Sequence, residues 1–239
     1  MDQVRLAVGI DPGFANTGIA VVQLEDDGRA RCLAVRFLHT PADKKAKKHG
    51  LRTDADDLRR FELIFDAATR AIDRSGAKVV GLETYKIAGA RGAPGIARQA
   101  GGNAWKVSMS YGVCVGAALS RGCKVFAHSP AELKVIACGR VAASKEDVMR
   151  GLATRCLDVH EVVERHFEQL RAERKVAAKS KYEHCYDAIG HALLALKTPK
   201  PPLKPEQVCP SCGAKLESRK CKSICTRCGY FDDCGVGPA

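Results

Sequence analysis

The sequence is poor in aromatic residues and has no long apolar run. Phe, Trp and Tyr make up only 5% of the 239 residues, with a single Trp. No stretch approaches the roughly 20 apolar residues needed to cross a bilayer, and the chain opens on Met1-Asp2-Gln3 without the basic and apolar regions of a signal peptide. We therefore expect a soluble, cytoplasmic protein that is neither membrane-spanning nor secreted.

Acidic side chains are also scarce, and one long stretch lacks them completely. The chain has 39 Lys and Arg against 27 Asp and Glu, which gives a formal charge of +12. Residues 84–131 contain no Asp or Glu, and their basic side chains are Lys86, Arg91, Arg98, Lys106, Arg121 and Lys124. Clustered Lys and Arg neutralise phosphates and release counterions, so nucleic acid is the predicted partner. A solvated helix face gives the same pattern.

The twelve cysteines fall into two groups of six. One group is scattered between Cys32 and Cys185, and we expect its members to be buried as small apolar side chains. The other group is confined to residues 209–234 and alone has metal-ligand spacing. Because the chain is long enough to build a core without disulfides, a disulfide scaffold is not expected.

Alternating strand and helix patterns predict an α/β fold. Strands are expected at residues 6–10, 18–22, 31–38, 78–83 and 124–127. Helices are expected at residues 58–72, 104–120 and 180–196, and two more should begin after Ser129 and Ser144. Residues 1–197 are predicted to form one domain, followed by a Pro-rich linker at 198–207 and a small domain at 208–239.

Four side chains are candidates for a metal site. Asp11 and Glu83 end predicted strands, where ligands gather in α/β sheets, and His184 and Asp187 share one predicted helix face. Such a set suits Mg²⁺ or Mn²⁺, which retain water and bind substrate phosphate. Two ions about 3.5–4 Å apart would activate water and stabilise a leaving 3′ oxygen. Each residue also has an ordinary structural role, such as a turn for Asp11, so spacing alone leaves the convergence open.

Four motifs in register resemble the RuvC Holliday-junction resolvase family. They are Gly9-Ile10-Asp11-Pro12-Gly13 with Thr17-Gly18, Leu82-Glu83, residues 128–134 with 139–148, and His184-x-x-Asp187-Ala188. The resemblance covers residues 4–196. It implies a ribonuclease H-like mixed sheet of five strands flanked by helices. It also implies a homodimer that makes paired Mg²⁺-dependent nicks in four-way DNA junctions during recombination or repair.

The resemblance also assigns roles to individual residues. Asp11, Glu83, His184 and Asp187 match the family's metal-binding catalytic set, with two Mg²⁺ (or Mn²⁺) per site. Lys134 and Lys145 match basic residues near the scissile phosphate, where they would stabilise transition-state charge; as surface lysines they would have no such role.

The family usually places a stacking aromatic residue shortly after the catalytic Glu. Here Tyr85 comes early and a Gly-rich insertion, residues 87–102, follows it. Tyr85 or Trp105 is therefore the predicted stacking residue, although either also fits a core position. The predicted DNA-contacting set is Tyr85, Lys86, Arg91, Arg98, Trp105 and Lys106.

The C-terminal cysteines form a second metal motif. Cys209-x-x-Cys212 and Cys225-x-x-Cys228 are separated by twelve residues, the spacing of a closed Cys₄ zinc ribbon. One structural Zn²⁺ would supply the folding free energy that a short segment with few large apolar residues lacks. Iron or disulfides also fit the spacing, and Cys221 is a substitute ligand. The segment is basic, so it would contact DNA or another protein.

The sequence therefore predicts a metal-dependent endonuclease that cuts branched DNA and carries a zinc ribbon, encoded by a bacterium or a phage. One alternative is another ribonuclease H-like nuclease that acts on flaps, on many branched forms or on RNA. A second is a non-catalytic nucleic-acid-binding protein. A third, an actin-like ATPase, would need further Gly-rich phosphate turns, which we do not find in the sequence.

Overall fold

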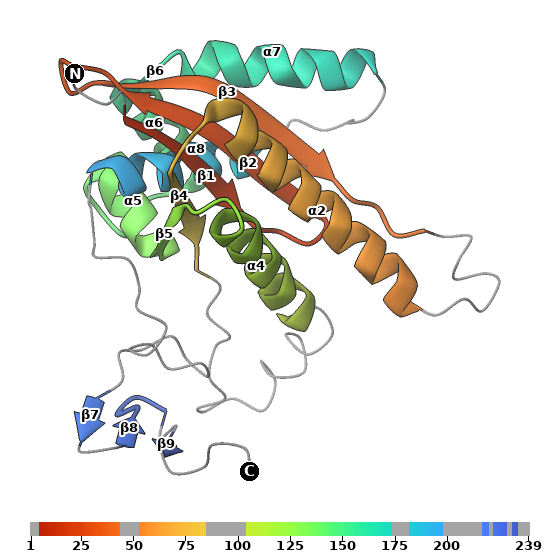
Figure 1. The fold of residues 1–239 in the computed structure, drawn as a ribbon. Helices are drawn as coiled ribbons and strands as arrows, with labels where there is room; N and C mark the ends of the chain where they lie inside the picture. The colour runs from red at the N-terminus through yellow and green to blue at the C-terminus, as the bar shows by residue number, and fades with distance from the viewer. Residues whose placement is uncertain are drawn as a thin grey trace.

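The computed structural model describes residues 5–43, 53–84, 104–173, 182–197, 217–219, 222–228 and 231–233. Its centre is a six-stranded sheet of order β5-β4-β1-β2-β3-β6 with helices on both faces (Figure 1). The strands are β1 (Arg5–Asp11), β2 (Asn16–Leu24), β3 (Ala30–His39), β4 (Val79–Glu83), β5 (Lys124–His128) and β6 (Cys156–Leu157). Strands β1, β2 and β3 form an antiparallel meander, whereas β4 and β5 run parallel to β1.

The predicted α/β fold is confirmed, but the predicted number of strands was wrong. All five predicted strands are present, and β6 adds a sixth that pairs in parallel with residues 30 and 31 of β3. Strand β6 has only two residues, so it carries no alternation that a sequence pattern can reveal.

Six helices surround the sheet among the described residues. They are α2 (Thr53–Ser75), α4 (Ala104–Leu119), α5 (Pro130–Cys138), α6 (Lys145–Arg155), α7 (Val159–Ala172) and α8 (Tyr182–Lys197). Ser129 and Ser144 both act as N-caps with reciprocal capping boxes, as their sequence contexts predict. Helix α7 was not predicted from the sequence, although it packs against β3 and α8.

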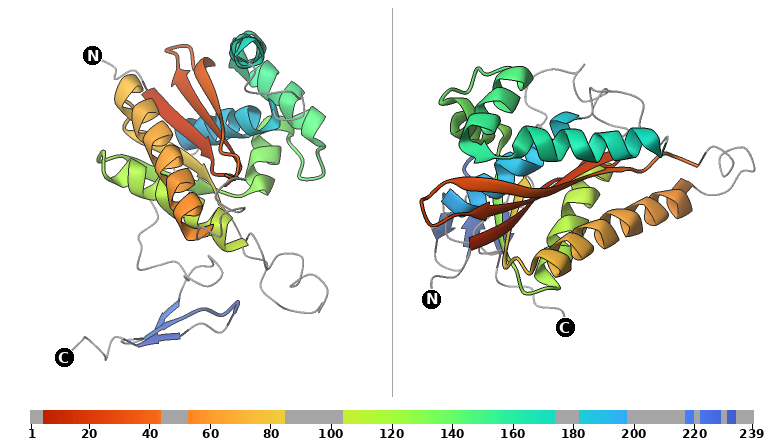
Figure 2. Two further views of the ribbon diagram at one scale, coloured as in Figure 1. Left: turned by 90° about the vertical axis from the view of Figure 1, so that its right-hand side faces the viewer. Right: turned by 90° about the horizontal axis from the view of Figure 1, so that it is seen from above.

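Alternate residues of the strands build two separate cores. Val8, Ile10 and Ile19 face α2 and α4, whereas Ala7 and Ala20 face the layer that contains α5 to α8. The views in Figure 2 show α2 and α7 on opposite sides of the sheet. Five of the scattered cysteines are buried and Cys138 is half-buried, which confirms their predicted role as small core side chains.

Helix α8 lies unusually close to the sheet because glycines face it from three strands. A Cβ atom on Gly9 of β1 would lie 1.9 Å from the carbonyl oxygen of Ala188. A Cβ on Gly18 of β2 would lie 1.9 Å from the His184 oxygen, and one on Gly81 of β4 would lie 2.1 Å from the His191 oxygen. Any larger residue would therefore push α8 away from the strand ends that carry Asp11 and Glu83.

The C-terminal region contains a small antiparallel sheet of β7 (Glu217–Arg219), β8 (Lys222–Ile224) and β9 (Phe231–Asp233). Cys225 directly follows β8 and is buried, and Cys228 lies in the turn after it. Cys209 and Cys212, like the linker at 198–207, lie outside the described residues, so the zinc ribbon and the domain boundaries stay predictions. In the described ranges, no helix has the length and apolarity needed to cross a membrane.

Candidate active site

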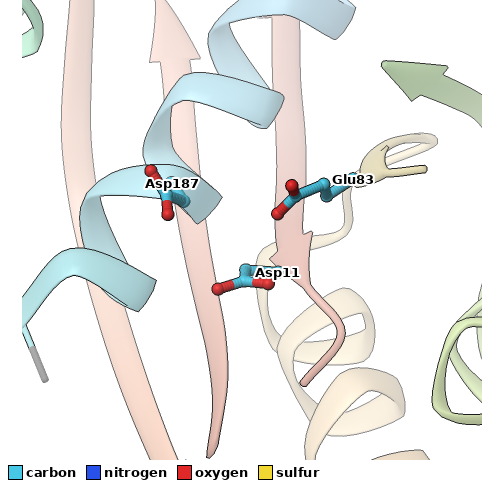
Figure 3. A group of neighbouring side chains, drawn as sticks. All are labelled: Asp11, Glu83 and Asp187. Carbon is cyan, nitrogen blue, oxygen red and sulfur yellow. The ribbon is translucent and has the colours of Figure 1, made fainter. Parts of the chain in front are cut away.

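Three carboxylates converge where β1 and β4 end. Asp11 is the last residue of β1, Glu83 is the last residue of the adjacent β4, and Asp187 comes from α8. One oxygen from each carboxylate lies within 4.8 Å of the others, and the three side chains point toward one another (Figure 3). A hollow of about 100 Å³ beside them is lined by Asp11, Pro12, Gly13, Glu83, Thr84 and Val107. The carboxylates of Asp11 and Glu83 thus face a space that can hold a small ligand.

The electrostatics of this cluster fit a divalent cation. Burial, together with the charges of Asp11 and Glu83, raises the pKa of Asp187 to about 8. Burial and the charge of Glu83 also raise the pKa of Asp11, although a hydrogen bond from His184 opposes this. Three carboxylates so close together resist full ionisation, and a cation between them removes that penalty. Oxygen-only donor sets with incomplete protein coordination are those that Mg²⁺ and Mn²⁺ use.

His184 lies beside Asp11 and is tied to it. The Nδ1 atom of His184 is 2.6 Å from Oδ2 of Asp11, and the ring stacks on Phe37 with 6.1 Å between centroids. Burial lowers the pKa of His184, but its hydrogen bond with Asp11 and the acidic charges around it outweigh burial and raise the pKa overall. Since Nδ1 is occupied, Nε2 is the ring atom available to a metal or a phosphate. The metal-ligand role predicted for His184 stays a prediction.

The two predicted lysines lie on neighbouring helices next to α8. Lys145 is the first residue of α6, and its Nζ is 2.5 Å from Oε2 of Glu183. This contact, reinforced by the charges of Asp187 and Asp11, raises the pKa of Lys145. Lys134 is half-buried on α5, which also packs against α8. The positive charge of Lys145 therefore interacts with the carboxylates of Asp11 and Asp187.

The predicted DNA-contacting residues are only partly described. Tyr85, Lys86, Arg91 and Arg98 lie outside the described residues. Trp105, at the start of α4, is 49% exposed. Lys106 follows it, but its Nζ is 2.8 Å from the buried carboxylate of Asp57, so its charge is already partly balanced within the protein.

Two buried histidines next to Glu83 were missed in the sequence analysis. His191, one helical turn beyond Asp187 on α8, has its Nε2 atom 3.8 Å from Oε2 of Glu83. His128, at the end of β5, stacks on His191 with 6.2 Å between the ring centroids. The signal was available for His191, because residues 184, 187 and 191 share one helix face.

A mixed sheet of this order, with carboxylates at the ends of two adjacent strands and a third on the helix that covers them, forms a candidate site for a divalent cation. The family model described as "Crossover junction endodeoxyribonuclease RuvC" matches residues 7–167. Because this match spans more than half of the chain, the protein belongs to the RuvC family. The resemblance seen in the motifs is thereby confirmed, although the match ends before α8 and does not include His184 or Asp187.

Curated RuvC proteins are similar to this chain over more than half of its length. The RuvC of Paenarthrobacter aurescens is 29% identical over 150 residues, which is 63% of this chain and 68% of that protein. The RuvC of Natranaerobius thermophilus is 26% identical over 145 residues, 61% of this chain and 76% of that protein. Each of these relatives carries the name crossover junction endodeoxyribonuclease.

Solved structures support the fold. The RuvC structure from Thermus thermophilus superposes with a TM-score of 0.52 at 22% identity, covering 79% of this chain and 91% of that one. T. thermophilus RuvC in complex with a Holliday junction substrate gives a TM-score of 0.51 at 21% identity, covering 79% and 90%. The α/β fold predicted from the sequence is thus the fold of these solved RuvC structures.

Proposed function

We propose that this protein resolves four-way DNA junctions by paired phosphodiester nicks, using divalent cations held by Asp11, Glu83 and Asp187. The observation that carries the proposal is the convergence of these three carboxylates in a chain of the RuvC family. The enzyme class, a crossover junction endodeoxyribonuclease, follows from family membership. The T. thermophilus relative bound to a Holliday junction supports branched DNA as the substrate.

Each residue of the site has a distinct part in the proposed reaction. Mg²⁺ or Mn²⁺ bound at the carboxylates would supply an activated water and neutralise charge on the leaving 3′ oxygen. His184 keeps the carboxylate of Asp11 in one orientation through their 2.6 Å contact. Lys145 on α6 and Lys134 on the preceding helix α5 would attract the scissile phosphate and stabilise the negative charge that develops on it.

A homodimer is part of the proposal. A four-way junction is two-fold symmetric and must be cut on two opposing strands, which suits two identical active sites related by a two-fold axis. The basic stretch at residues 84–131 and the exposed Trp105 would supply phosphate and base contacts on each protomer.

The test is cleavage of a labelled four-way junction in Mg²⁺, with linear duplex, flap and RNA–DNA hybrid assayed alongside. Junction-selective nicks at paired positions on opposing strands are expected, and EDTA should abolish them. Equal cleavage of all branched forms, or of the hybrid alone, would retain the metal site but replace the resolvase by a broader nuclease. Tight binding with no cleavage under any metal would overturn the proposed activity.

The C-terminal segment is proposed to be a zinc ribbon with Cys209, Cys212, Cys225 and Cys228 as ligands. Cys209→Ser should lower the zinc content from about one ion per chain to well below one, because a tetrahedral Cys₄ site loses a thiolate. Elemental analysis of the purified proteins measures zinc and iron together. Cys138→Ser, which changes a half-buried cysteine of the nuclease domain, is the control and should keep the metal. Unchanged zinc in Cys209→Ser would exclude that ligand.

A further inference from the structure

The buried side chain of His191 lies next to the carboxylate of Glu83, one of the three carboxylates of the site. His191 is 0% exposed, and its Nε2 atom lies 3.8 Å from Oε2 of Glu83. This distance is slightly longer than a hydrogen bond, and a small rotation of the Glu83 carboxylate would close it. In the tautomer with the proton on Nε2, the ring would then donate to Glu83.

The ring of His191 has no other polar role in the part of the chain that the structure describes. Neither ring nitrogen has a hydrogen-bond partner there. A polar group buried in this way costs stability, since it has lost its water without gaining a full hydrogen bond. A purely structural position between a helix and a sheet is better filled by an aliphatic side chain. The arrangement therefore calls for an explanation outside the folding of the apolar core.

Contacts on the other side of His191 restrict how the ring can move. The ring of His128 stacks on it at an interplanar angle of 17°. His128 and Glu83 are register partners on the parallel strands β5 and β4. The carbonyl oxygen of His128 also accepts hydrogen bonds from the amide (2.8 Å) and the hydroxyl (3.2 Å) of Thr84, which follows Glu83. The end of β5 thus fixes both the backbone at Glu83 and the ring that faces its carboxylate.

We propose that His191 is a positioning residue for Glu83: it orients this carboxylate toward the bound cation by donating a hydrogen bond from Nε2, and the stacked ring of His128 holds it in place. This inference rests on the metal site of the proposed function. Partners of metal ligands typically matter because they fix ligand orientation, and their loss lowers metal affinity about 10–100-fold. Gly81 makes the contact possible, since its missing Cβ lets α8 bring His191 down onto β4.

The test compares Mn²⁺ binding by titration calorimetry to wild type, His191→Leu, His191→Gln and Asp11→Asn. His191→Leu removes the donor at similar volume, so the dissociation constant for Mn²⁺ should rise about 10–100-fold. His191→Gln places an amide NH₂ close to where Nε2 lies and should recover most of the affinity. In EDTA, His191→Leu should unfold at a temperature close to that of wild type, because leucine fills the same buried space.

A second readout separates positioning from general damage to α8. Junction nicking by His191→Leu should need more Mn²⁺ for half-maximal rate but approach the wild-type rate at saturating Mn²⁺. Ile189→Leu, a buried and volume-conserving change on the same helix, is the control and should shift neither quantity.

The outcomes distinguish this inference from the function on which it rests. Loss of Mn²⁺ binding in Asp11→Asn with unchanged binding in His191→Leu would overturn the role of His191 and leave the metal site standing. Unchanged Mn²⁺ binding in Asp11→Asn itself would overturn the metal site and with it both proposals. Lower thermal stability of His191→Leu in EDTA, with wild-type Mn²⁺ affinity in the folded fraction, would make His191 a structural residue only.

Discussion

Asp11→Asn is expected to slow junction cleavage by at least about 10²–10³-fold, the loss typical when one electrostatic contact to a transition state is removed. The substitution keeps the side-chain shape but replaces a charged metal ligand by a neutral amide. Junction affinity should stay within a few-fold of wild type, because the phosphate-contacting lysines are unchanged. Single-turnover nicking of a labelled junction and gel-shift binding in EDTA measure the two effects.

The same variant also reports on the electrostatics of the cluster. Because its pKa is raised in the folded protein, ionised Asp11 is a destabilising charge at pH values above that pKa when no cation is bound. In EDTA at pH 8, Asp11→Asn should therefore unfold at the same temperature as wild type or higher. Asp26→Asn, in the exposed turn after β2, is the control and should change neither rate nor stability. Wild-type cleavage by Asp11→Asn would refute the assigned site.

Gly9→Ala is expected to be strongly destabilising, although it changes no charged group. Its Cβ would lie 1.9 Å from the Ala188 oxygen and 2.6 Å from the Ala192 nitrogen, which are both backbone atoms of α8. Neither atom can move aside without shifting the helix, so the loss of stability should reach or exceed the upper end of the about 1–3 kcal/mol usual for overpacking. Since α8 carries His184 and Asp187, the folded fraction should also lose most of its nicking activity.

A second glycine, Gly116, serves as a control for whether the close approach of α8 to Gly9 causes the loss of stability. Gly116 lies within α4, and a Cβ there would meet no atom within 4 Å. Gly116→Ala should be neutral or stabilising by up to about 1 kcal/mol, since alanine is the better helix former. Urea unfolding of both variants, with nicking assays at a temperature where each is folded, makes the comparison. Equal stability of Gly9→Ala and wild type would show that α8 does not depend on contact at Gly9.

The sequence was informative wherever the relevant signal is local. Strand periodicity located β1 and β4 and put Asp11 and Glu83 at their ends, and the N-caps at Ser129 and Ser144 follow from neighbours three residues away. Strand β6 and helix α7 were not predicted from the sequence. A two-residue strand has no period, and only three residues of α7 (Val159, Val163 and Phe167) are buried, so its apolar face is narrow.

The ion pair of Lys106 could not be predicted from the sequence, and the predicted contact of this lysine with DNA stays a prediction. Lys106 belongs to a stretch with no acidic residue, and so it was predicted to contact DNA. In the structure its Nζ lies 2.8 Å from Asp57 on α2, which precedes it by 49 residues. Ion pairs between distant segments depend on how two helices pack, and local charge counting does not contain that information.

The α/β class, the family motifs and the candidate carboxylates could be predicted from the sequence, because each depends on the spacing of residues that are close together in the chain. Three features depend on how distant segments pack. Asp187 lies with Asp11 and Glu83 in a cluster within 4.8 Å, His184 forms a hydrogen bond with Asp11, 173 positions away, and Nε2 of His191 lies 3.8 Å from Glu83. The physical reason is the packing of α8. Glycines on β1, β2 and β4 let its backbone approach the sheet closely, and this approach brings His184, Asp187 and His191 to the strand ends that carry Asp11 and Glu83.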